Sequence, residues 1–174
     1  MAEDEFLTTD PDYSSIQYEE PKPRVGVATI VHKGPNILLG KSKKKGTEGQ
    51  WVIPGGGIRE YETIQEASTR EIAEETGVVC GNQEMLFLSE RVNKAEKEHR
   101  IVIYVVGQWL SGEIKAGDDL SEVRWVDPRD LGLYQHQMGE MTIDAFMKYS
   151  MVLKAKAMSG RPIAQMEVPP NQVN

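Results

Sequence analysis

The sequence contains one cysteine and no long apolar run. With Cys80 alone, the chain cannot form an internal disulfide or a multi-cysteine zinc site. A reducing compartment such as the cytoplasm is therefore the expected location. No stretch approaches the roughly 20 apolar residues of a membrane-spanning helix, and the acidic first residues lack the basic and apolar regions of a signal peptide. We expect a cytoplasmic protein that makes no membrane contact.

Basic residues are absent from the first 20 positions, which hold seven acidic residues. The rest of the chain holds 20 acidic and 20 basic residues, so the net charge of −7 lies in this first segment. Such a segment is typical of a solvated arm, with a partner-binding arm as the alternative. The balanced remainder argues against a broad nucleic-acid surface.

The length of 174 residues and the hydrophobic share of 39% predict one folded domain with its own core. We expect an acidic, flexible arm over residues 1–22, the domain over 23–158 and an irregular tail over 159–174. Runs rich in Val and Ile predict strands, and helix-forming composition with helical spacing of apolar residues predicts two helices. The expected strands are 24–34, 36–42, 84–92, 99–110 and 122–127, and the expected helices are 63–76 and 138–158. Strands interspersed with helices predict an α/β fold.

The stretch GGGIREYETIQEASTREIAEETG, residues 55–77, places six glutamates behind three glycines. Thr63 and Glu66 form a capping-box pattern at the start of the predicted helix, and Gly77 suits its end. On that helix Glu71, Glu74 and Glu75 fall in one sector, beside the apolar positions that should pack inward. Like charges at this spacing destabilise a helix, and partial burial strengthens the repulsion.

A bound divalent cation would remove this conflict. Mg²⁺ and Mn²⁺ prefer carboxylate oxygens, and Mg²⁺ keeps several waters. Arg70 is placed to orient a carboxylate by a charged hydrogen bond, and the glycines at 55–57 let the backbone approach metal and substrate closely. The alternative is an ordinary solvated acidic helix, and spacing alone leaves both interpretations open.

The same stretch resembles the signature of the Nudix hydrolase family. That signature is glycine, five residues, glutamate, seven residues, Arg-Glu, an aliphatic residue, any residue, Glu-Glu, any residue, glycine and an aliphatic residue. Every fixed position matches, and the flanking ILLGKS, WVIPGGG and SEVRWVD segments are also similar to the family. The matching residues are Gly56, Glu62, Arg70, Glu71, Ile72, Glu74, Glu75, Gly77 and Val78.

The resemblance implies an α/β/α sandwich with a mixed sheet and the Mg²⁺-dependent hydrolysis of a nucleoside diphosphate linked to a group X. It implies that Glu71, Glu74 and Glu75 bind the metal together with the carbonyl of Gly55. Glu71 is then also the expected general base, oriented by Arg70. Glu62 is expected to support this shell, with a structural role in the loop as its alternative.

Other site residues are expected from outside these positions. A further acidic ligand is sought near the later strands, where no acid occurs between residues 101 and 109. Asp118, Asp119 and Glu122 in the next loop are candidates, and Glu122 is preferred over a base-binding role or a plain surface position. For Trp51, stacking on a base is weighed against a core role, and the lysines of the 41–45 loop are weighed as a phosphate clamp or a solvated loop. The residues expected to contact substrate are Lys41, Lys43, Trp51, Gly56 and Gly57.

A nucleoside triphosphate or a small nucleotide derivative is the expected substrate. The alternatives are an ADP-ribose or nucleotide-sugar hydrolase, an RNA 5′-end (cap) pyrophosphohydrolase, and a non-catalytic nucleotide sensor. Sensors often lack a signature glutamate, whereas this chain keeps all of them. The expected partner is thus a small nucleotide, with the chain as a monomer or homodimer.

Overall fold

The computed structural model describes residues 23–158. The arm expected over residues 1–22 and the tail expected over 159–174 lie outside the described residues, so both stay predictions. No helix within the described part of the chain is long and apolar enough to cross a membrane.

Seven strands and three helices make up the described part of the chain, joined by two 3-10 turns. The strands are β1 (Arg24–Lys33), β2 (Asn36–Ser42), β3 (Trp51–Val52), β4 (Gly55–Gly57), β5 (Val79–Asn93), β6 (Glu98–Ser111) and β7 (Leu120–Val126). The helices are α1 (Ile64–Thr76), α2 (Leu131–Tyr134) and α3 (Glu140–Met158), and the 3-10 turns are η2 (Pro128–Asp130) and η3 (Gln135–Gln137).

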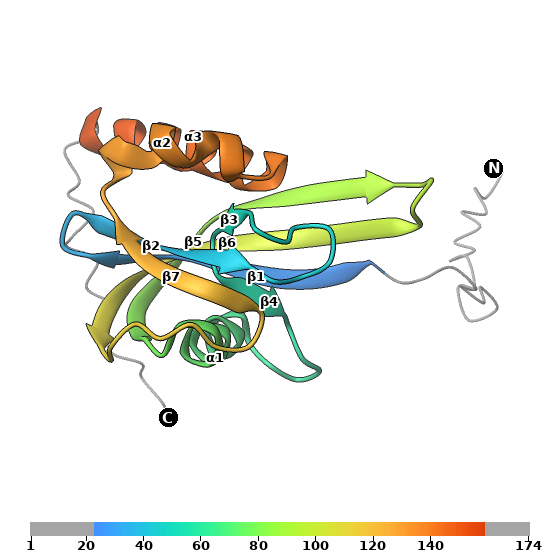
Figure 1. The fold of residues 1–174 in the computed structure, drawn as a ribbon, viewed down its shortest axis with the longest axis horizontal. Coiled ribbons are helices and arrows are strands. Elements are labelled where there is room, and N and C mark those ends of the chain that lie inside the picture. Colours follow the sequence, from blue (N-terminus) through green and yellow to red (C-terminus); the bar gives the residue numbers. More distant parts are fainter. Residues whose placement is uncertain (1–22, 159–174) are drawn as a thin grey trace, which may run out of the picture.

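The strands form one mixed sheet, whose main path runs β3-β2-β1-β6-β5. Strand β4 pairs with β1, and β7 pairs with β2. The β1–β6 pair is parallel and the other pairs are antiparallel. Helix α1 covers one face of the sheet, and α2 and α3 lie over the other (Figure 1). This arrangement confirms the expected α/β/α sandwich.

Strand β1 lies in the middle of the sheet and contributes to the core on both faces. Val27 packs with Ala67 of α1, whereas Ala28 and Ile30 pack with Tyr149 of α3. This alternation is the period-two pattern of a strand that is covered on both sides. Strand β1 packs against α1 and also pairs with β4, the strand of three glycines. The position of β4 relative to α1 is therefore set by β1.

Helix α1 has the expected caps. The side chain of Thr63 accepts from the backbone of Glu66, the Glu66 carboxylate accepts from the backbone of Thr63, and Gly77 ends the helix with φ 71°. Several elements differ from expectation, among them the short strands β3 and β4, which were not expected. Strand β5 begins at Val79, well before residue 84, because bulges let it follow β6 despite register shifts. Helix α2 and the 3-10 turns follow Pro128 without any apolar period long enough to predict them.

Candidate active site

The buried end of the site is the carboxylate of Glu75, in the last turn of α1. Glu75 is 2% exposed, and its Oε2 accepts a 2.8 Å hydrogen bond from the backbone N–H of Gly55. The Nζ of Lys44 lies 3.5 Å from Oε1. Burial raises the pKa of Glu75 to about 7, against the lowering effects of Gly55 and Lys44. The fold therefore holds a carboxylate where its charged form is poorly compensated.

The glycine strand leaves room for the second buried carboxylate, that of Glu71. A Cβ added to Gly56 would lie only 2.4 Å from Oε2 of Glu71, so this position admits no larger residue unless the carboxylate moves. A Cβ on Gly55 would lie 2.1 Å from the carbonyl oxygen of Val27. A Cβ on Gly57, by contrast, would meet nothing within 4 Å. The close packing therefore requires glycine at positions 55 and 56 but not at position 57.

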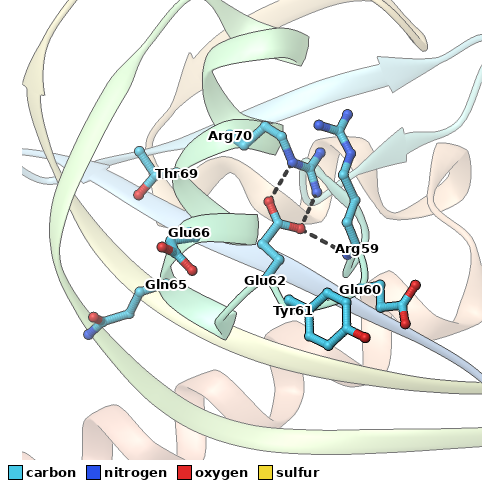
Figure 2. A pocket seen from close by; sticks show the side chains of 8 residues that line it. All are labelled: Arg59, Glu60, Tyr61, Glu62, Gln65, Glu66, Thr69 and Arg70. Atoms are coloured by element: carbon cyan, nitrogen blue, oxygen red, sulfur yellow. Dashed lines mark hydrogen bonds and ion pairs between the residues drawn. The ribbon is translucent and has the colours of Figure 1, made fainter.

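Arg70 connects the two glutamates of the first part of the signature. It donates from Nε and Nη2 to the two oxygens of Glu62 at 2.6 and 2.7 Å, and from Nη1 to Oε1 of Glu71 at 2.6 Å. Figure 2 shows the paired bonds to Glu62, which also accepts from the backbone of Arg59. Hydrogen bonding by Arg70 lowers the pKa of Glu62 to about 2. Glu62 is thus a fixed anion that holds Arg70 against Glu71.

Glu74 lies in a different environment from its two neighbours in the signature. Its side chain is 41% exposed and lies 3.4 Å from Nη2 of Arg59 and 3.3 Å from Nη1 of Arg70. Glu71 and Glu75 are buried, as their place beside the apolar face predicts, but Glu74 lies at the solvent edge.

Within residues 23–158, no group of three or more His, Cys, Asp or Glu side chains is gathered closely enough to hold a metal ion. Cations of the chain occupy the carboxylates, because Arg70 binds Glu71 and Glu74 while Lys44 binds Glu75. The oxygen donors suit a hard divalent cation, and such an ion would favour the charged form of the buried Glu75 carboxylate, which burial disfavours. The donor set therefore fits a metal, provided that Arg70 and Lys44 yield part of their contacts.

Glu122, the acidic ligand preferred from outside the signature, lies in a different place from Asp119, one of its alternatives. Glu122 lies on β7 and pairs with Arg124 of the same strand, outside the lining of the cleft described below. Asp119 lines that cleft and lies 2.9 Å from Nζ of Lys44. Burial lowers the pKa of Lys44, but hydrogen bonds and charges of Asp119 and Glu75 outweigh it, so the pKa is raised. Asp119 is thus the acid of this loop that the fold connects to the signature.

The expected substrate-contact residues are also divided. Trp51 is 3% exposed and packs with Leu39 and Val126, so a base cannot stack on it unless the ring leaves the core. This burial favours the core role. Lys41 has its Nζ 5.8 Å from the Trp51 ring, and the backbone N–H of Lys43 donates to the backbone carbonyl of Asp119. Lys44 is the lysine of this loop that reaches a signature glutamate.

A cleft of about 610 Å³ joins these elements. One end contains Glu75, Lys44 and the β4 glycines, and the cleft continues along β1 and β6 to Arg24 and Arg100. A separate, open hollow surrounds Glu62 at the start of α1, and Figure 2 shows the eight side chains that line it. The cleft thus combines the buried carboxylate of Glu75 with space for a ligand.

The model of the NUDIX domain matches residues 21–148. The chain belongs to the Nudix family. This confirms the resemblance seen in the signature, and the family generally uses a divalent metal ion.

Two curated relatives have names that describe an activity on nucleotides. An ADP-ribose pyrophosphatase of Methanocaldococcus jannaschii is 36% identical over 109 residues, which cover 63% of this chain and 64% of that enzyme. The nucleoside triphosphatase NudI of Escherichia coli is 31% identical over 121 residues, which cover 60% of this chain and 82% of that enzyme. The chain therefore spans somewhat less than two thirds of the archaeal enzyme. The expected class, a nucleotide pyrophosphohydrolase, agrees with both names.

Among solved structures, the MutT NUDIX hydrolase of Burkholderia pseudomallei has the same fold. It superposes with a TM-score of 0.66 at 26% identity, over 74% of this chain and 98% of that chain. The superposition thus covers almost the whole of that hydrolase.

Proposed function

We propose that this Nudix domain hydrolyses a nucleoside diphosphate linked to a group X, releasing a nucleoside monophosphate and phosphorylated X. The observation that carries the proposal is the buried carboxylate of Glu75, held by the amide of Gly55 within a complete signature. A carboxylate whose charge is so poorly compensated is an appropriate ligand for a cation. Glu71, Glu74 and Glu75 would hold Mg²⁺, or Mn²⁺ in its place, with the carbonyl of Gly55 as a further ligand.

The residues of the chain divide the work of the reaction. A bound divalent cation would neutralise charge on the phosphoryl group and acidify the attacking water. Arg70, fixed by Glu62, holds one oxygen of Glu71, which is the proposed proton acceptor. The water oxygen forms the new bond to phosphorus, the bridging P–O bond breaks, and the water proton passes to Glu71. Lys44 lines the cleft and is the proposed contact for the phosphate chain.

The substrate proposed is a small molecule, namely a nucleoside triphosphate or a small nucleotide derivative. The names of the two relatives support a nucleoside triphosphate and ADP-ribose as the first compounds to test. The domain would act in the cytoplasm as a monomer or homodimer. The free thiol of Cys80, which is buried, is compatible with a reducing compartment.

The test is product formation in oxygen-18 water, with Mg²⁺ and EDTA arms. The panel contains nucleoside triphosphates, ADP-ribose, nucleotide sugars, dinucleoside polyphosphates and capped RNA. We expect turnover only with the divalent ion, and the label in one of the two products, because water attacks a single phosphorus. Tight binding without product for every compound would overturn the proposal in favour of a nucleotide sensor.

A further inference from the structure

Three arginines form a row across adjacent strands at the far end of the cleft. Arg24 of β1 is the register partner of Arg100 of β6, which is in turn the partner of Arg91 of β5. Register partners on neighbouring strands project to the same face of a sheet, and strands lie about 4.8 Å apart. All three residues line the cleft that contains Glu75. Arg24, Arg91 and Arg100 are called the arginine row below.

The face on which the row lies follows from the unbroken pairing of β1 with β6. Ala28 and Tyr104 are also register partners, and both pack against α3. Arg24 and Arg100 each precede them by four residues, an even number, so the row projects to the α3 side of the sheet. The first residues of α3 line the same cleft. The row is therefore a wall of the cleft rather than part of the opposite surface.

Like charges directly opposite one another on neighbouring strands destabilise a sheet. Glu98 relieves part of this repulsion, since its carboxylate lies 2.5 Å from Nε of Arg100 and 3.6 Å from Nε of Arg91. One carboxylate neutralises only one of three positive charges. Glu140 also lines the cleft. Glu90 is bound to His99, and as the neighbour of Arg91 along the strand it projects to the other face.

Arg91 and Arg100 are both held by Glu98, and both remain accessible to solvent. Their side chains are 48% and 47% exposed, whereas Glu98 is 16% exposed. Glu98 thus holds both guanidinium groups at their Nε ends while their surfaces remain open to solvent. An arginine held in this way loses less conformational freedom when it binds a phosphate or carboxylate with its planar fork.

The distance between the two ends of the cleft can be read from the register. Gly55, whose amide binds Glu75, pairs with Ala28, four residues along β1 from Arg24. At about 3.3 Å per residue, the arginine row lies about 13 Å along the strand from the amide that holds the carboxylate of Glu75. A nucleotide whose anhydride lies at the signature would therefore reach the row with a different part of the molecule.

We infer that the arginine row binds a second phosphate group of the substrate, separate from the anhydride that is hydrolysed. The inference rests on the proposed function and names its substrate class, a nucleoside diphosphate derivative with an additional phosphate ester. That ester lies either on the ribose of the nucleoside or on X, and the same guanidinium chemistry serves both.

Binding in EDTA, measured by calorimetry on the full chain, separates these sources without turnover. Adenosine 3′,5′-bisphosphate is compared with AMP, and ribose 1,5-bisphosphate with ribose 5-phosphate. We expect one bisphosphate to bind at least tenfold more tightly than its monophosphate. This advantage should fall to about twofold or less in the Arg91→Ala/Arg100→Ala variant. The Arg91→Lys/Arg100→Lys variant, which keeps the charge but loses the planar fork, should retain part of it.

The matched control is the Lys94→Ala/Lys97→Ala variant, which removes two positive charges from the turn of the same β5–β6 hairpin outside the cleft lining. Equal losses in this control, or no advantage for either bisphosphate in the wild type, would overturn the inference. Deleting residues 1–20 gives a further test. If the deletion increases the affinity for all four compounds equally in the wild type but not in the arginine variant, the acidic segment rather than a phosphate occupies the arginine row, and the inference is overturned.

The two proposals fail separately. If the wild type hydrolyses nothing in the oxygen-18 panel but keeps its arginine-dependent preference for a bisphosphate, the proposed function fails and the binding site stands. If the wild type hydrolyses nucleotides but binds no bisphosphate more tightly, the inference fails and the proposed function stands. Circular dichroism melts of each variant confirm that the comparison is made between folded proteins.

Discussion

Glu62 lies just before helix α1 and Glu75 in its last turn, and their carboxylates are held in opposite electrostatic states. Arg70 binds both oxygens of Glu62 and lowers its pKa to about 2, whereas burial raises the pKa of Glu75 to about 7. Glu62 is therefore an anion whose charge is already matched. The charged form of Glu75 is matched only in part, by Lys44 and the amide of Gly55. Two glutamates of one signature are thus held differently: Glu62 fixes an arginine, and Glu75 is the proposed ligand of a cation.

The largest expected effect is a loss of turnover when Glu75, the proposed metal ligand of the pair, is replaced. Replacing Glu75 with Gln should lower kcat at saturating Mg²⁺ by about 100-fold or more, because a charged ligand is lost. The same change should leave the melting temperature in EDTA at pH 8 equal to or above that of the wild type, since a neutral amide avoids the cost of burying a charge. Glu74→Gln should lose turnover similarly, as it removes another ligand.

The control for this experiment is Glu66→Gln on the same helix. Glu66 forms the capping box with Thr63, and glutamine can replace glutamate in that motif. Kinetics and melts of this variant should stay close to the wild type. Near wild-type turnover of Glu75→Gln at saturating Mg²⁺ would refute its role as a ligand.

A second prediction concerns the carboxylate between the two ends, Glu71. A Cβ at Gly56 would displace Oε2 of Glu71, from which it would lie 2.4 Å. Because a displacement of about 1 Å can reduce a rate about 100-fold, Gly56→Ala should lower kcat/KM by up to that factor. Gly57→Ala is the matched change, since its Cβ would meet nothing within 4 Å, and its loss should be at most about threefold. Equal losses in the two variants would show that the contact with Glu71 is not the cause.

Much of helix α1 could be predicted because its determinants are local. Thr63, Glu66 and Gly77 set its ends through contacts within a few residues, and the spacing of its apolar positions sets its buried face. Burial of Glu71 and Glu75 follows from that face. Spacing alone could not predict that Glu74 is exposed while Glu71 and Glu75 are buried. All three fall in one sector of the helix, and the helical spacing does not determine how much of that sector the neighbouring strand covers.

The contacts that sequence reasoning missed are non-local. A register shift between Lys41 and Ser42 in the β2–β7 pairing pairs Ser42 with Leu120, so Asp119 comes next to the Lys43–Lys44 segment. No pattern within the loop distinguishes Asp119 from Glu122, because the difference arises from the bulge. The arginine row depends on the register of three strands, and both β5 and β6 are separated from β1 by more than 40 residues.

The smallest expected effect tests the other end of the comparison, Glu62, through the pH dependence of stability in EDTA. A carboxyl with its pKa lowered from 4.5 to about 2 stabilises the fold above pH 4.5. This contribution is lost as the pH falls from about 4.5 toward 2, because the unfolded chain then binds a proton that the folded chain does not. Glu62→Gln should therefore melt a few degrees below the wild type at pH 7, and the two melting temperatures should converge as the pH falls from 5 to 3. Glu60→Gln is the control, since Glu60 lies in the same loop and forms no ion pair among residues 23–158. It should melt with the wild type at pH 7, and a constant gap between Glu62→Gln and the wild type down to pH 3 would contradict the assignment of Glu62 as the fixed anion.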